Sequence, residues 1–160
     1  MSIVMQVLAA VVGTISFSLL YGVPRKYYLY CGMIGGAGWL LYCLLLPSSS
    51  PPEAALSATV LVILMSRWFA VRERCPVTIF LISGIFPLVP GSGVYWMAYD
   101  IVTGDMDKAA ESGFLALKVA VAIVLGIVFV FQLPQRVFCF GRWQKKRRED
   151  EAGLRQMKKD

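Results

Sequence analysis

The part of this sequence with the clearest chemical potential is the run PLVPGSG near the middle of the chain. Pro87 and Pro90 have no backbone N–H and clash with the preceding helical turn, so both interrupt a helix. Gly91 and Gly93 permit backbone conformations that a side chain would forbid. A helix starting at Gly91-Ser92-Gly93 would present free N–H groups and a positive dipole end, which favour carboxylates. The run therefore predicts a helix break with an anion site; the alternative is a structural kink.

Other polar side chains could belong to the same site. Tyr95 and Tyr99 follow the first glycine of the break at i+4 and i+8, so they would share its helix face. Arg67 could pair with a substrate carboxylate or could anchor its span by reaching the interface. Asp100 and Lys118 could serve ion coupling. The alternatives are an ordinary helix-end carboxylate and another interfacial cation.

A long apolar stretch, Pro76–Asp105, must position these groups. At ~1.5 Å of rise per residue, Pro76–Phe86 covers about 16 Å and Gly91–Ile101 about the same. The break is therefore predicted near the middle of a hydrocarbon core about 30 Å thick. Irregular backbone at that depth is tolerated only where protein buries it or where it lines a wet cavity. Such broken helices are typical of transporter binding sites.

Composition places the chain among membrane proteins. Hydrophobic residues make up 58% and charged residues 16% of the chain, and the mean hydropathy is +0.65. Nine of the sixteen Lys/Arg residues lie from Arg136 onward, so the net charge of +6 belongs mostly to one tail. Neither a basic-aromatic surface nor a motif for nucleic acid is visible, and we expect no nucleic-acid partner.

The fold predicted is an all-α polytopic membrane protein with five transmembrane helices, the fourth broken at mid-membrane by PLVPG. Residues 1–135 form the membrane domain and residues 136–160 a basic cytoplasmic tail. The sequence Pro47–Pro52 is predicted to be a non-helical loop. The predicted spans are Ile3–Gly22, Tyr27–Leu46, Glu53–Val71, Pro76–Asp105 and Ser112–Gln132.

Charge alternates between successive connections, which predicts the orientation. The basic connections contain Arg25 with Lys26, Arg72 with Arg74, and the tail from Arg136. The uncharged N-terminus, the Ser/Pro loop and the Asp-rich loop fall on the other side. Because basic loops stay cytoplasmic, the N-terminus is predicted outside and the C-terminus inside a bacterial inner membrane.

Several functional classes are not expected. Histidine is absent, and the four cysteines have no metal-type spacing, so we expect no metal, no cofactor, no catalytic residues and no enzyme. Cysteines are read as small apolar residues rather than a disulfide framework: Cys31, Cys43, Cys75 and Cys139. Gly32 and Gly36 form a GxxxG pair that lets another helix approach closely, and this face is a possible docking surface for a second component.

From Pro87 through Asp105, the sequence PLVPGSGVYWMAYDIVTGD resembles the second, smaller membrane domain of the threonine/serine exporter family. The motif Pro87–Gly91, Tyr95, Gly104-Asp105 and the run Ala116–Gly126 carry the resemblance, and the order of elements agrees over most of residues 1–132. The resemblance implies export of threonine and serine, or of succinate in the split two-component form. It also implies that this chain is the separate small subunit.

The function expected is therefore the small subunit of a secondary exporter of carboxylate-bearing metabolites, driven by a proton or ion gradient. The partner would be a larger membrane subunit of the same family, although homo-oligomers could supply the missing walls instead. The alternative is a non-transporting assembly or scaffold subunit. The basic tail could also bind anionic membrane lipids.

The charge alternation makes a direct prediction about topology. A reporter fused after Asp160 should be cytoplasmic, and one inserted in Ser48–Ser50 should lie outside, because basic connections are retained in the cytoplasm. At each position, one fusion to an enzyme that is active only outside and one fusion to a protein that fluoresces only inside measure on which side the position lies. Finding both positions on one side would refute the five-span topology.

Overall fold

The computed structural model describes residues 2–132, so Cys139 and the predicted tail at 136–160 lie outside the described residues. The described chain is helical and contains no strand, which confirms the all-α prediction. The elements are α1 (Ile3–Leu20), η1 (Arg25–Tyr27), α2 (Tyr28–Leu45), α3 (Pro51–Glu73), α4 (Thr78–Ile85), η2 (Phe86–Leu88), α5 (Gly91–Thr103) and α6 (Met106–Gln132).

The helix lengths agree with the predicted spans. Within the described residues, α1, α2 with η1, α3 and α6 are each long and apolar enough to cross a membrane. The fifth candidate is the pair Thr78–Leu88 and Gly91–Thr103, which is bent by 44° and can form one broken span. The predicted polytopic architecture is therefore confirmed, and its break falls at the predicted motif.

The start of α3 shows why one boundary was predicted wrongly. Pro51 and Pro52 belong to the first turn of α3, although the sequence suggested a loop through both. Proline is tolerated there because first-turn N–H groups lack helical acceptors. Ser50 and Glu53 form a capping box, in which the Ser50 N–H donates to Oε2 of Glu53 at 3.1 Å. At the other end, Arg74 takes a left-handed conformation with φ 55° and ends the helix.

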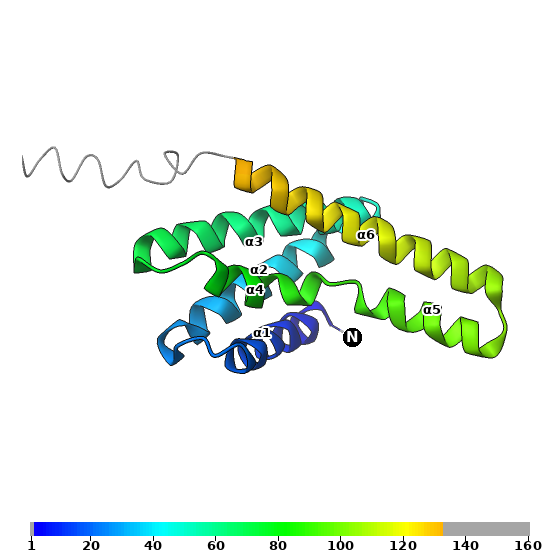
Figure 1. The fold of residues 1–160 in the computed structure, drawn as a ribbon, viewed down its shortest axis with the longest axis horizontal. Helices are drawn as coiled ribbons and strands as arrows, with labels where there is room; N and C mark the ends of the chain where they lie inside the picture. Colours follow the sequence, from blue (N-terminus) through cyan, green and yellow to red (C-terminus); the bar gives the residue numbers. More distant parts are fainter. Residues whose placement is uncertain (1, 133–160) are drawn as a thin grey trace, which may run out of the picture.

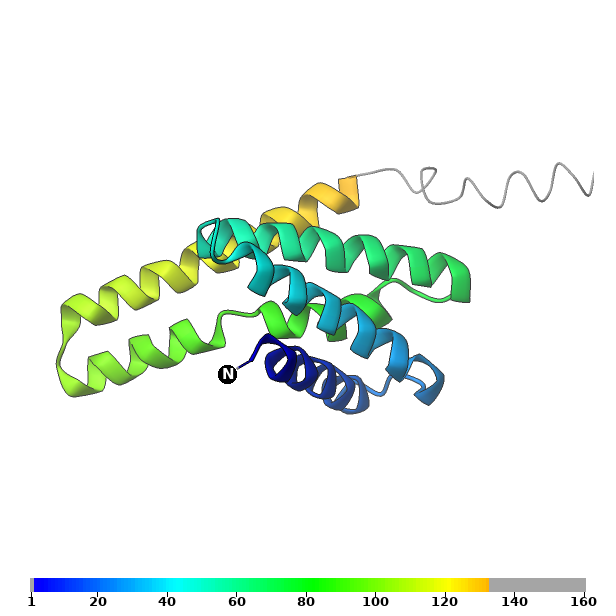
Figure 2. The same ribbon diagram turned by 180° about the vertical axis from the view of Figure 1, so that it is seen from behind.

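Two packing groups make up the structure (Figure 1). Helix α2 packs against α1, α3 and α4, whereas α6 packs against α3 and α5. Both views show α5 and the first half of α6 as a hairpin that extends away from α1–α4 (Figure 2). The break between η2 and α5 lies at the base of this hairpin.

Small residues on α2 allow α1 to approach closely. A Cβ at Gly32 would lie 3.0 Å from the Ile15 side chain, and one at Gly36 would lie 2.5 Å from Val11. The prediction that this GxxxG pair packs against a helix is correct. The proposed docking of a second component there is wrong, because α1 of the same chain already covers both glycines.

The tightest point of this interface generates a stability prediction. A Cβ added at Gly35 would overlap the Thr14 side chain, whereas a Cβ at Gly13 on α1 meets nothing within 4 Å. Gly35→Ala should therefore destabilise the fold by about 1–3 kcal/mol through overpacking. Thermal unfolding in detergent, followed by circular dichroism, measures the effect against the control Gly13→Ala. Equal melting temperatures for the two variants would contradict the packing described.

Candidate functional site

The helix break spans Val89 and Pro90 and is closed by local hydrogen bonds. Val89 is extended, with φ −60° and ψ 130°, and Pro90 has φ −74° and ψ 52°. The Gly91 N–H donates to the Val89 carbonyl at 2.7 Å, which closes an inverse γ-turn centred on Pro90. The Val89 N–H donates to the Phe86 carbonyl at 3.2 Å, while Pro87 occupies the first turn of η2. The backbone thus changes direction over two residues.

Two backbone donors remain available at the start of α5. The Val94 N–H is the first in α5 to reach an i−4 acceptor, the Pro90 carbonyl at 3.2 Å. The N–H groups of Ser92 and Gly93 precede it and have no hydrogen-bond partner within residues 2–132. The γ-turn uses the N–H of Gly91, which the sequence counted as a third donor. Two adjacent N–H groups at a helix start suit one carboxylate.

The glycines of the break are important because they lack a side chain, not because they adopt unusual backbone angles. In the described residues, positive φ among glycines is found at Gly22 and Gly104, so Gly91 and Gly93 do not use the freedom expected of them. A Cβ at Gly91 would meet nothing within 4 Å, which leaves the approach to α5 open. A Cβ at Gly93 would lie 3.0 Å from that of Ala116, so this glycine brings α5 against α6.

Aromatic side chains extend the open face of α5. The helix has no buried residue, and Tyr95 and Tyr99 are 62% and 50% exposed. Trp96 lies edge-on to both, with ring centroids 5.4 Å from Tyr95 and 5.7 Å from Tyr99. Trp96 was not predicted; its i, i+3 spacing to Tyr99 was the available signal. Helix α5 thus carries three exposed aromatic rings in the turns that follow its open start.

Arg67 lies in the α3–α6 interface and contacts the last described turn of α6. Its side chain is buried, and Nη1 donates to the Val130 carbonyl at 2.6 Å. The guanidinium carbon lies 5.5 Å from the centre of the Phe131 ring. A buried guanidinium that donates to a backbone carbonyl of the neighbouring helix links the two helices through a charge-assisted hydrogen bond. These contacts fit an anchoring role between two helices.

Asp100 and Lys118 are not brought to the break. Asp100 lies nine residues after Gly91 on α5, about 13.5 Å along the helix, and is partly exposed. Lys118 is exposed on α6, with Nζ 4.4 Å from the centre of the Phe114 ring. Because Ala116 faces α5, a residue two positions later points about 200° around the helix and away from it. The structure therefore leaves Arg67, Asp100 and Lys118 apart from the two free N–H donors at the start of α5.

The possible metal ligands and the cysteines of residues 2–132 are dispersed along the chain. No three His, Cys, Asp or Glu side chains in this part of the chain come together as a metal site would require. Cys31, Cys43 and Cys75 are free cysteines there. The geometry instead offers backbone donors and aromatic rings beside an open helix start.

A comparison with protein-family models gives a match over most of the chain. The family model described as Threonine/Serine exporter, ThrE, matches residues 6–132, which include the break and every described helix from the first turns of α1 to the end of α6. No curated protein and no solved structure matched the chain. Because the family match covers more than half of the sequence, the chain belongs to the threonine/serine exporter family.

Proposed function

We propose that this chain is the small subunit of a two-component secondary exporter and that the break contacts the carboxylate of the exported metabolite. The substrate class would be threonine and serine, or a dicarboxylate such as succinate. The observation that carries the proposal is the pair of unpartnered N–H groups of Ser92 and Gly93 beside the open space at Gly91. Each of these substrates carries a carboxylate that could accept from both donors.

The lengths of the two half-helices support a site deep in the membrane. The first part, Thr78–Leu88, covers about 16 Å and Gly91–Thr103 about 20 Å at ~1.5 Å per residue. Together they suffice for a hydrocarbon core about 30 Å thick, with the break between them near its middle. At that depth the two donors act in a medium where water competes little, so they would attract an anion more strongly than at the surface.

The exposed surface of α5 supports a second component. Helix α5 packs on α6, and none of its residues is buried in the described chain. A substrate site at mid-membrane needs walls on every side, since unsatisfied polar groups in lipid cost several kcal/mol. We therefore propose that a larger subunit of the same family covers this face, with a second copy of this chain as the other source of a wall.

The charged residues enter the proposal with different roles. Asp100 is the proposed proton carrier, because its carboxylate has no hydrogen bond or ion pair within residues 2–132 and lies on the same helix as the break. Lys118 remains a proposed coupling residue, although its side chain would not contact the bound substrate. For Arg67, the bond to Val130 favours anchoring over substrate contact.

A scaffold role is the second candidate, and one observation favours it. The γ-turn satisfies Gly91 locally, so part of the break is stable without any ligand. In that case α5 would only pack against the transporting subunit. Substitutions that block the N–H groups but preserve the turn separate these functions.

Gly91→Leu provides such a substitution. Because a Cβ at Gly91 meets nothing within 4 Å, the larger side chain should leave insertion intact while obstructing the Ser92 and Gly93 donors. Efflux should fall by about tenfold or more, the range expected when a charge-assisted hydrogen bond is lost. Export of labelled threonine, serine and succinate from cells measures this, alongside membrane abundance.

Gly13→Leu is the matched control, because Gly13 is also a helical glycine with open space and lies in α1. Pro90→Ala, which restores an N–H and removes the ring that fixes φ, should also impair export. Wild-type efflux from both Gly91→Leu and Pro90→Ala would leave the break with a purely structural role.

The need for a second component can be tested separately. The purified chain in liposomes should show no substrate flux alone and should gain flux with the larger subunit of the same exporter, because α5 is uncovered in the single chain. Flux is measured by release of labelled substrate under an imposed proton gradient. Equal flux from the chain alone would contradict the two-component proposal.

A further inference from the structure

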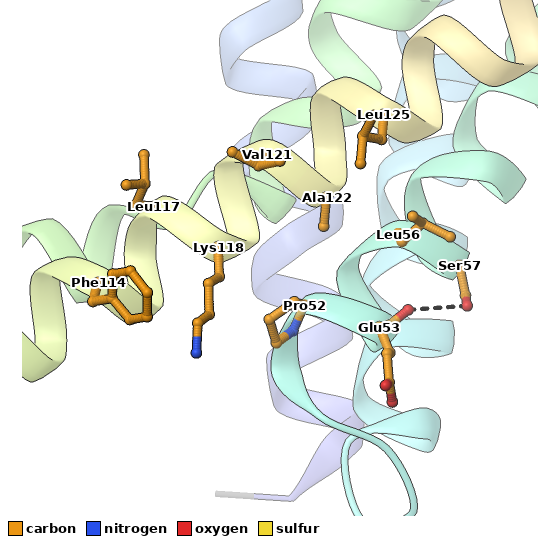
Figure 3. Close-up of a pocket in the computed structure, with 10 residues that line it drawn as sticks. All are labelled: Pro52, Glu53, Leu56, Ser57, Phe114, Leu117, Lys118, Val121, Ala122 and Leu125. Atoms are coloured by element: carbon orange, nitrogen blue, oxygen red, sulfur yellow. Dashed lines mark hydrogen bonds between the residues drawn. The ribbon is translucent and has the colours of Figure 1, made fainter.

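A groove between the start of α3 and the middle of α6 is separate from the helix break. It has a volume of about 620 Å³ and is open at the side. Its walls are mostly hydrocarbon, and its two charged side chains are Glu53 from α3 and Lys118 from α6 (Figure 3). Lys118 comes two positions after Ala116, which packs against α5, so the groove and α5 lie on different faces of α6. An occupant of the groove therefore leaves the exposed face of α5 free.

Neither charge has a counter-charge in the described part of the chain. Glu53 and Lys118 take part in no ion pair within residues 2–132. The Glu53 carboxylate accepts from the Ser50 N–H at 3.1 Å, and the Lys118 ammonium lies over the Phe114 ring. An ionised carboxylate has about four acceptor positions and an ammonium has about three donors, so both groups can take a further partner.

Helix α6 carries an apolar ridge along the groove. Its members are each about half exposed or more: Phe114, Leu117, Val121 and Leu125. Their spacing of three or four residues places them on one helix face, as in helices that pack along one another. The surface around the groove thus combines an apolar ridge, an apolar hollow and two opposite charges.

The two charges make this surface complementary to itself. Any occupant must supply a cation opposite Glu53 and an anion opposite Lys118. A second copy of the chain supplies both with the same two residues, because a two-fold axis brings one surface patch against its own copy. Copies inserted with one topology are related by an axis along the membrane normal, which keeps each residue at its own depth. In Figure 3 the two side chains extend in the same direction, as such a pairing needs.

We propose that this chain forms a two-fold symmetric dimer through the α3–α6 groove, in which Glu53 of each copy pairs with Lys118 of the other. The apolar ridge of each α6 lies in the groove of the opposite copy. Lipid acyl chains would cover the ridge but carry no counter-charge, and a helix of a different protein would need both charges at matching positions. The dimer surface is separate from the α5 face, and the inference does not depend on transport.

Charge reversal tests whether the pairing is between copies. Glu53→Lys leaves two cations on each patch and Lys118→Glu leaves two anions, so neither variant should dimerise with itself. Because the symmetry forms each pair twice, the dimer dissociation constant should rise by about a hundredfold, through the loss of two charge-assisted hydrogen bonds. A mixture of the two variants should dimerise, because each cation then meets an anion. Energy transfer between labelled copies of the full chain in liposomes measures this.

The mixture also controls for folding, because a variant that does not fold cannot dimerise with the other. Lys108→Glu is the matched control: it reverses a cation on α6 that pairs with Asp105 at 2.6 Å outside the groove. This control should dimerise like the wild-type chain. A monomeric wild-type chain, a dimer that neither reversal weakens, or a mixture that stays monomeric would each overturn the proposal.

Cysteine cross-linking tests the same contact in native membranes. Chains with Glu53→Cys or Lys118→Cys are given different tags and produced together, with the four native cysteines replaced by alanine. Oxidation should yield a dimer that carries both tags, whereas either chain produced alone should yield none. Absence of the doubly tagged product, including the case in which a chain is linked to a different protein, would assign the groove another occupant and refute the dimer.

Discussion

The satisfaction of backbone N–H groups around the break is the constraint on which the rest of the structure depends. A chain that stops being helical must supply new partners for its peptide groups, and lipid supplies none. Pro87 and Pro90 lower the demand because they have no N–H to satisfy. The N–H groups of Val89 and Gly91 are then paired locally, with the carbonyls of Phe86 and Val89. The donors that remain in this stretch are concentrated at the start of α5, where the proposed carboxylate would bind.

Helix α6 places that stretch relative to the rest of the chain. Its first half holds α5 through small residues, with Gly93 against Ala116 and Gly113 against Met97. Its second half holds α3, where Gly126 lies against Thr59. The Arg67 bond to the Val130 carbonyl fixes the far end of the same contact. Helix α6 therefore links the position of α5 to that of α3.

Local sequence patterns predicted the helices and the position of the break but not the contacts between distant residues. Proline positions constrain the backbone directly, so PLVPG fixed where the helix stops. The same pattern could not say which residue would turn, and the turn fell on Pro90 rather than on the glycines. Arg67 has its partner 63 residues away, which no local spacing encodes. The capping motif at Ser50 and Glu53 was readable, and its use would have corrected the start of α3.

The exposed face of α5 can be argued further from its polar atoms. With the break at the proposed depth, Tyr95 lies about 6 Å and Tyr99 about 12 Å from Gly91 along the helix, so the first phenol falls within hydrocarbon. Neither hydroxyl donates a hydrogen bond within the described residues. A phenol without a partner in lipid costs about 1–3 kcal/mol, and two free N–H groups nearby add to that cost. Lipid alone is therefore a poor neighbour for this face. Water in a cavity, or polar groups of another subunit, would satisfy the same atoms, and the transport pathway proposed between two subunits would provide both.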